Sequence, residues 1–168
     1  AYGSEDGLYI NGHVTGNSPY LTFEWKTDNE SKYHEVQTRL IGEYNFPNAL
    51  AAVTIGHFFG VEPEKIDKAL AGYTPQNNRS QLKKTADNTL IIDAYNANPT
   101  SMMASISNFR NMQAENKMLI LGDMRELGKD SADEHQKIAD YLEECGFKDV
   151  VLVGELFAAT RHSYQSYP

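Results

Sequence analysis

Residues 89–109, TLIIDAYNANPTSMMASISNF, contain the change of pattern that decides the fold class. The apolar run Thr89–Asp93 is typical of a buried β-strand. Asn98 and Pro99 then have the order expected at a helix start, a capping residue followed by a proline. One face of this helix is apolar and carries Met102, Met103, Ile106 and Phe109. A strand followed at once by a helix predicts the first half of a β-α-β unit.

The same alternation continues towards the C-terminus. Lys117–Leu121 predicts a second strand, and Asp149–Val153 predicts a third. Between them, Ser131 and Glu134 have the spacing of a capping box, and the helix that they open is expected to end at Gly146. Strand, helix, strand, helix and strand in this order predict an α/β fold, with a Rossmann-like parallel sheet and right-handed crossovers.

The first forty residues instead alternate apolar and polar side chains at period two. Turn-forming runs divide them into three segments, which predicts three antiparallel strands. The apolar positions are Leu8 and Ile10, then Leu21, Phe23 and Trp25, then Val36 and Leu40, with Thr38 in register.

Two helices are expected after these strands. Asn45 can cap the first helix, which has Pro47 in its first turn and stops at Gly60. The second runs from Pro63 to about Gly72. Its apolar face carries Ile66, Ala69 and Leu70.

The stretch Tyr73–Arg79 contains Pro75 and three amides and is interpreted as a linker between two domains. We place the boundary between residues 74 and 75. The chain is therefore expected to consist of a strand-and-helix part, 1–74, and a Rossmann-like part, 75–168.

Composition excludes some classes of function. The chain carries 23 Asp and Glu against 15 Lys and Arg, a net charge of −8, so no nucleic-acid partner is expected. The single cysteine, Cys145, lies in an apolar helical pattern and is expected to pack as a small hydrophobe. One cysteine suits a reducing compartment. The sequence shows neither a signal peptide nor an apolar run near the roughly 20 residues of a membrane span. A cytoplasmic location is therefore expected. We also expect a monomer.

Two polar loops follow predicted strands, where ligands bind in open parallel sheets. In the loop Asp93–Pro99, Asp93 can accept hydrogen bonds from two ribose hydroxyls. Asn96 and Asn98 can bind a polar ligand, although Asn-rich loops also make good turns and Asn98 can cap the next helix. In the loop Leu121–Gly128, Asp123 is interpreted as a turn residue that leads into a helix.

Three further side chains are candidates for nucleotide binding. Asn45 and Asn48 are three residues apart and share a helix face, so their amides can bind an adenine edge or a ribose. The alternatives are capping by Asn45 and a solvent-exposed Asn48. Arg79, at the end of the linker, can bind a phosphate with two parallel hydrogen bonds, or can be a surface arginine.

Several motifs are missing from the sequence. The phosphate loop, G-x-x-x-x-G-K-[ST], is absent. At Gly128-Lys129 the next residue is Asp130 instead of Ser or Thr, and Asp123 stands where the motif has its first glycine. There is no G-x-G-x-x-G motif, and the five histidines show no metal-ligand spacing, so no metal site is expected.

The remaining motifs resemble one family. Ile41–Ala52 resembles the G-x-H-N-x-x-N-x-x-A-A signature of Mur ligases and folylpolyglutamate synthetases, and Asn78–Gln81 is similar to their G-R-x-[EQ] element. Asp93–Pro99 and Leu121–Gly128 resemble the D-x-Y-N-A-N-P and L-G-D-M-x-E-L-G elements of the Mur ligases that add D-alanyl-D-alanine. The four elements stand in the family's order over roughly residues 41–128.

The resemblance implies an activity and its substrates. ATP activates the carboxylate of UDP-N-acetylmuramoyl-tripeptide as an acyl phosphate, the amine of D-alanyl-D-alanine attacks it, and Mg²⁺ assists. Residues 1–74 would then be the end of the central ATP-binding domain, of the phosphate-loop type, and 75–168 most of the C-terminal domain. The alternatives are another Mur ligase, a folylpolyglutamate synthetase, or a non-enzymatic Rossmann-like binding module. Without a phosphate loop, the chain by itself is expected to be inactive.

The resemblance also implies roles for single residues. Asn45 and Asn48 would contact the adenine and ribose of ATP, Arg79 would act in catalysis at the terminal phosphate, and Asp93 would bind the ribose. The residues implied to line the substrate cleft are Tyr95, Asn96 and Asn98. Three positions depart from the family pattern: Tyr44 replaces a histidine, Asn78 replaces a glycine, and Ala94 leaves one acid where many members have two.

Overall fold

A computed structural model describes residues 1–76 and 78–168. The chain forms two compact units, Ala1–Asp93 and Ala94–Pro168. The linker expected at Tyr73–Arg79 includes Asn77, which lies outside the described residues. The domain boundary expected between residues 74 and 75 stays a prediction.

The first unit contains a four-stranded sheet in the order β1 (Tyr2–Gly3), β2 (Ile10–Gly16), β3 (Tyr20–Thr27) and β4 (His34–Ile41). β2, β3 and β4 are antiparallel neighbours, so the three predicted strands are confirmed. Their period-two pattern gives the sheet one apolar face: Leu21, Phe23 and Trp25 of β3 are all fully buried.

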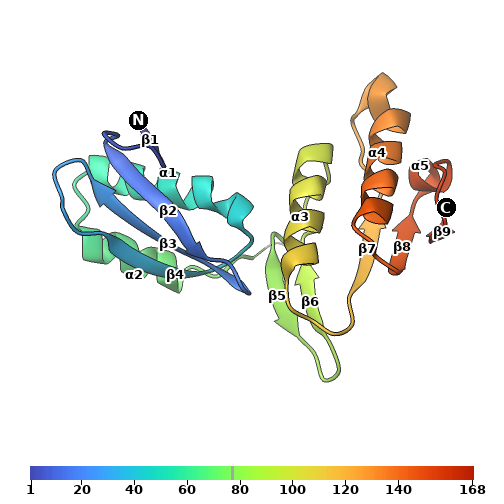
Figure 1. Cartoon of the computed structure of the whole chain (residues 1–168), viewed down its shortest axis with the longest axis horizontal. Coiled ribbons are helices and arrows are strands. Elements are labelled where there is room, and N and C mark those ends of the chain that lie inside the picture. Colours follow the sequence, from blue (N-terminus) through green and yellow to red (C-terminus); the bar gives the residue numbers. More distant parts are fainter. Residues whose placement is uncertain (77) are drawn as a thin grey trace. The chain divides into compact units, whose positions relative to one another are not determined.

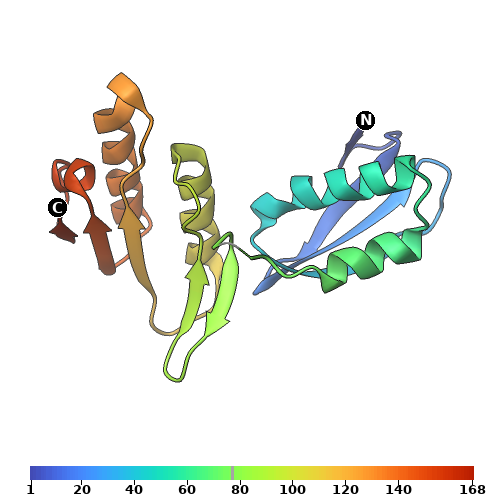
Figure 2. The same ribbon diagram turned by 180° about the vertical axis from the view of Figure 1, so that it is seen from behind.

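Two helices, α1 (Phe46–Phe58) and α2 (Pro63–Gly72), cover this apolar face (Figures 1 and 2). Both predicted helices are confirmed, and each has a proline in its first turn. The prediction that Asn45 caps α1 through its side chain is wrong. A 3-10 turn, η1 (Glu43–Asn45), leads into the helix, and the Asn45 amide nitrogen instead donates to the carbonyl of Ile41 at 2.8 Å.

The first unit ends in a hairpin of β5 (Gln81–Lys84) and β6 (Thr89–Ile92). The prediction that Thr89–Asp93 joins the parallel sheet is wrong, because β6 pairs antiparallel with β5. A short turn produces this local pairing: the Thr85 amide donates to the Asn88 carbonyl at 2.8 Å, and the Asn88 amide donates to the Thr85 hydroxyl at 2.9 Å.

The second unit is built on a parallel sheet in the order β7 (Met118–Gly122), β8 (Asp149–Val153) and β9 (Gln165–Tyr167). The predicted parallel pairing of the segments at 117–121 and 149–153 is confirmed, and β9 adds a third strand. The helical elements are α3 (Pro99–Asn111), η2 (Gly128–Asp130), α4 (Ser131–Glu144) and α5 (Glu155–Ala158). The core residues are Met102, Ile106, Met124, Ile138, Leu142, Val150, Leu152 and Phe157. Within the described part of the chain, no helix has the length and apolarity of a membrane span.

The helix starts of this unit differ in part from the sequence prediction. Ser131 and Glu134 form no capping box, because η2 already leads the chain into α4. A capping box stands at α3 instead, where Asn98 Oδ1 accepts from the Ser101 amide at 2.9 Å. The predicted capping role of Asn98 is confirmed. Cys145 packs at the edge of the core, as expected.

Candidate functional site

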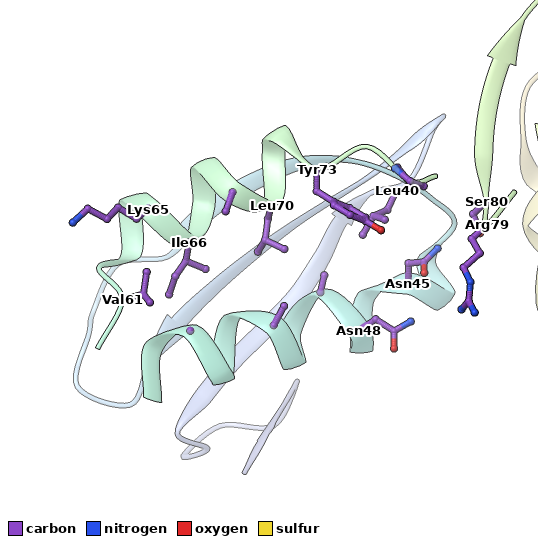
Figure 3. A pocket seen from close by; sticks show the side chains of 15 residues that line it. Leu40, Asn45, Asn48, Val61, Lys65, Ile66, Leu70, Tyr73, Arg79 and Ser80 are labelled. Atoms are coloured by element: carbon purple, nitrogen blue, oxygen red, sulfur yellow. The ribbon is translucent and has the colours of Figure 1, made fainter. Parts of the chain in front are cut away.

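A pocket of about 590 Å³ lies between α1 and α2 of the first unit (Figure 3). Small side chains of α1 leave room for it: Ala49, Ala52 and Gly56 line one wall. Ile66, Ala69 and Leu70 of α2 line the other wall. A Cβ at Gly56 would come within 3.2 Å of Ile66, so the glycine allows the two helices to approach at that point. The walls of the pocket are therefore largely apolar.

The polar end of the pocket is formed by Asn45, Asn48, Arg79 and Ser80 (Figure 3). Asn45 and Asn48 stand at the N-terminal end of α1, where the helix dipole favours an anion. Arg79 is exposed and adds a guanidinium to the same rim. Three residues predicted from two separate sequence motifs thus line one cavity.

The two asparagines differ in their surroundings. Asn45 is half-buried, and its bond to the Ile41 carbonyl fixes the direction of the amide. An amide side chain has two N–H donors and an acceptor oxygen, so this bond uses only part of its capacity. Asn48 is exposed and faces the rim.

Asp93 is tied to the same rim through Ser80. The Ser80 amide donates to Asp93 Oδ1 at 3.2 Å, and the Ser80 hydroxyl lies 3.4 Å from Asp93 Oδ2. The phenol oxygen of Tyr44 lies 2.8 Å from the Ser80 hydroxyl and 3.4 Å from Asp93 Oδ2. Ser80 is buried, whereas Asp93 is exposed to solvent.

Sequence reasoning missed Ser80 and treated Tyr44 only as a departure from a motif. The available signals were the position of Ser80 next to Arg79 and the aromatic hydroxyl at position 44. Neither signal shows that the two hydroxyls meet.

The predicted substrate-cleft residues belong to the second unit. Tyr95 and Asn96 are exposed, and Asn98 is exposed while its side-chain oxygen caps α3. Their roles in binding substrate stay predictions.

The loop Leu121–Gly128 is held by structural bonds. Asp123 accepts the backbone N–H groups of Leu156 and Phe157 at 3.1 and 2.9 Å, so it caps α5 rather than the helix that follows it in sequence. The buried His135 accepts the Met124 N–H at 3.0 Å. Among residues 1–76 and 78–168, no group of three or more His, Cys, Asp or Glu side chains is arranged to hold a metal ion.

Comparison with known proteins adds an independent observation. The sequence model of one family, described as Mur ligase, glutamate ligase domain, matches residues 78–165. The chain is also 45% identical over 91 residues to the UDP-N-acetylmuramoyl-tripeptide–D-alanyl-D-alanine ligase of Bacillus subtilis (strain 168). That alignment covers 53% of the chain and 20% of the relative.

Solved structures show the same likeness. The chain is similar to MurF from Acinetobacter baumannii, with a TM-score of 0.82 and 28% identity, over 98% of this chain and 37% of that one. It also shares its fold with the MurF ligase from Thermotoga maritima solved in complex with ADP, with a TM-score of 0.80 and 16% identity, over 98% and 38% of the two chains. The chain therefore spans between 20% and 38% of the length of these three proteins.

Proposed function

Because the chain belongs to the Mur ligase family, we propose that it is part of an ATP-dependent ligase that joins D-alanyl-D-alanine to UDP-N-acetylmuramoyl-tripeptide. The B. subtilis relative carries this name, and the A. baumannii structure is that of a MurF. The run Tyr95–Pro99 matches the D-alanyl-D-alanine-adding members and favours them over a folylpolyglutamate synthetase.

One observation carries the proposal: Asn45, Asn48 and Arg79 line the same end of one pocket, and Asp93 is bonded to Ser80 on its rim. This set of side chains suits a nucleoside polyphosphate. Amides bind the adenine edge and ribose, and the Asp93 carboxylate accepts from ribose hydroxyls. The Arg79 guanidinium pairs with the terminal phosphate. The ADP complex of the T. maritima protein is consistent with nucleotide binding by this fold.

These residues would contribute to catalysis by positioning the nucleotide and by electrostatic stabilisation of the transition state. As the terminal phosphate transfers to the tripeptide carboxylate, a fixed guanidinium at Arg79 stabilises the negative charge on its oxygens. Mg²⁺ would supply further charge neutralisation at the phosphates. We place Tyr95, Asn96 and Asn98 at the cleft for the incoming dipeptide. A monomer acting in the cytoplasm is part of the proposal.

A chimaera tests the proposed function. The segment of A. baumannii MurF that aligns with this chain is replaced by residues 1–168, and phosphate release is measured with ATP, Mg²⁺, UDP-N-acetylmuramoyl-tripeptide and D-alanyl-D-alanine. The structural match over 98% of the chain makes the replacement feasible. Release that depends on both peptide substrates is expected. The unfused chain, which has no phosphate loop, should release no phosphate above background.

Two results would count against the proposal. A folded chimaera that binds both peptide substrates but releases no phosphate would show that this chain cannot supply its part of the site. Turnover by the unfused chain would show that the phosphate-binding elements lie elsewhere than proposed.

A further inference from the structure

We infer that Tyr44 is a positioning residue for the proposed nucleotide site: its hydroxyl holds Ser80, and through Ser80 it fixes Asp93 and the backbone beside Arg79. The inference rests on the proposed function, because it assigns Tyr44 a task in binding the same nucleotide. It concerns a position where the chain departs from the family's histidine.

The direction of the Tyr44 ring is set by Gly42. Gly42 has φ +88°, in the left-handed region that favours glycine, and a Cβ built there would overlap the ring of Tyr44. The 3-10 turn Glu43–Asn45 then carries the ring back across the glycine. An alanine at position 42 would displace the ring, so the glycine and the tyrosine act as a pair.

Tyr44, Ser80 and Asp93 form a chain of hydrogen bonds that begins at the Tyr44 hydroxyl. The hydroxyl oxygens of Tyr44 and Ser80 lie 2.8 Å apart, and either can be the donor. When Tyr44 donates, Ser80 is left to donate from its hydroxyl and its backbone N–H to the two oxygens of Asp93, at 3.4 and 3.2 Å. A carboxylate offers about four acceptor positions. Asp93 therefore keeps acceptor capacity for two ribose hydroxyls while its orientation is fixed.

The backbone around Arg79 needs this support. Its neighbours Asn78 and Ser80 have φ of +58° and +44°, a conformation that non-glycine residues seldom keep unless the surroundings hold them there. Ser80 is buried and bonded on both sides, to Tyr44 and to Asp93. Because Arg79 lies between the two left-handed residues, its direction into the pocket depends on Ser80.

The first test needs no nucleotide. Solvent exchange of the Ser80 amide is measured by NMR on the 168-residue chain and on Tyr44→Phe, which removes only the hydroxyl. We expect exchange to be faster by about 3- to 10-fold, the scale of one lost hydrogen bond. Tyr33→Phe is the matched control, since its hydroxyl donates to Asn11 at 2.8 Å in another part of the unit. Unchanged Ser80 exchange in Tyr44→Phe would overturn the inference.

The second test asks whether Tyr44 affects nucleotide binding through the position of Asp93. ADP is titrated calorimetrically into the A. baumannii chimaera and into chimaeras that carry Tyr44→Phe, Asp93→Ala or both substitutions. We expect Tyr44→Phe to weaken ADP binding about 3- to 10-fold in the wild-type background and less than about twofold when Asp93 is already absent. The inference would be overturned if Tyr44→Phe weakened ADP binding equally with and without the Asp93 side chain. It would also be overturned if Tyr44→Phe weakened ADP binding only when Asp93 is already replaced by Ala. A folded parent chimaera that binds no ADP would instead contradict the proposed function, and Ser80 exchange would still decide the role of Tyr44.

Discussion

The carboxylate of Asp123 occupies the space beside Gly154 in which any other residue would place its Cβ. Gly154 has φ +120°. Asp123 accepts hydrogen bonds from two backbone N–H groups of α5, the helix that directly follows Gly154. A loop after β7 is in this way attached to the end of β8, so both residues serve the structure of the second unit.

Gly154→Ala is therefore expected to destabilise the chain by about 2–4 kcal/mol, from backbone strain together with displacement of Asp123. Urea unfolding followed by circular dichroism measures the change. Gly122→Ala is the control, because a Cβ there meets nothing within 4 Å, and it should change stability by less than about 0.5 kcal/mol. Equal stability of the two variants would show that the Asp123–Gly154 contact is absent in solution.

The Asn98 cap can be separated from its proposed role at the substrate cleft. Asn98→Ala loses the acceptor for the Ser101 amide and should cost about 0.5–2 kcal/mol of stability. Asn98→Asp keeps the acceptor and should stay near wild-type stability, while it removes the amide donors from the cleft. If Asn98→Asp destabilises as much as Asn98→Ala, the capping geometry is wrong.

A pH-dependent contribution is expected from Glu30. Burial alone raises the pKa of this carboxyl, but hydrogen bonds from the Thr27 amide and hydroxyl, with His34 nearby, outweigh burial and lower the pKa below its usual value. A lowered pKa means that the carboxylate stabilises the fold above its unfolded-state pKa, and that this stability is lost as pH falls through the folded-state pKa. Glu30→Gln should thus cost about 1 kcal/mol at pH 7, a figure reduced for partial exposure. The difference should begin to shrink as pH falls below the ordinary glutamate pKa of about 4.3, and should close as pH falls through the lowered folded-state pKa.

Unfolding of wild type and Glu30→Gln at pH 7 and pH 3 measures this contribution. Glu115→Gln, on an exposed loop, controls for the loss of one charge. A stability difference that persists unchanged at pH 3 would rule out the carboxylate as its source.

Limited proteolysis distinguishes two positions for the domain boundary. Closing enzymes place their hinges in short connectors, and we expect a protease of broad specificity to cut first within Tyr73–Arg79. The compact units divide later, between Asp93 and Ala94, whereas the family match begins at residue 78. Mass spectrometry of the first fragments reads out the position. A first cut inside Thr89–Val153 would contradict the predicted boundary.

Sequence alone predicted those parts of the fold that local rules control. The period-two pattern gave β2 to β4, and the prolines at 47 and 63 with Gly60 and Gly72 bounded the two helices closely. The partner of β6 was predicted wrongly, because an apolar run shows that a strand is buried but not which strand it pairs with. The strand β9, three residues long, is too short to show any periodicity.

The candidate site was predictable to a similar extent. Asn45, Asn48 and Arg79 came from motif positions, and the structure places them on one pocket. The bond between Tyr44 and Ser80 joins residues 36 positions apart, so no local pattern contains it. The hydrogen-bond chain that holds Asp93 became visible only when the two segments were folded together.

The most direct test of the nucleotide site is steady-state kinetics of the A. baumannii chimaera carrying Arg79→Ala or Asp93→Ala. Arg79→Ala should mainly lower kcat, by about 10²-fold or more, because its charge is needed most as the phosphate transfers. Asp93→Ala should mainly raise KM for ATP, by roughly 10- to 100-fold, since ribose binding is the same in ground and transition states. Well-folded variants with both constants within about threefold of the parent chimaera would contradict the assignment of the nucleotide site to these residues.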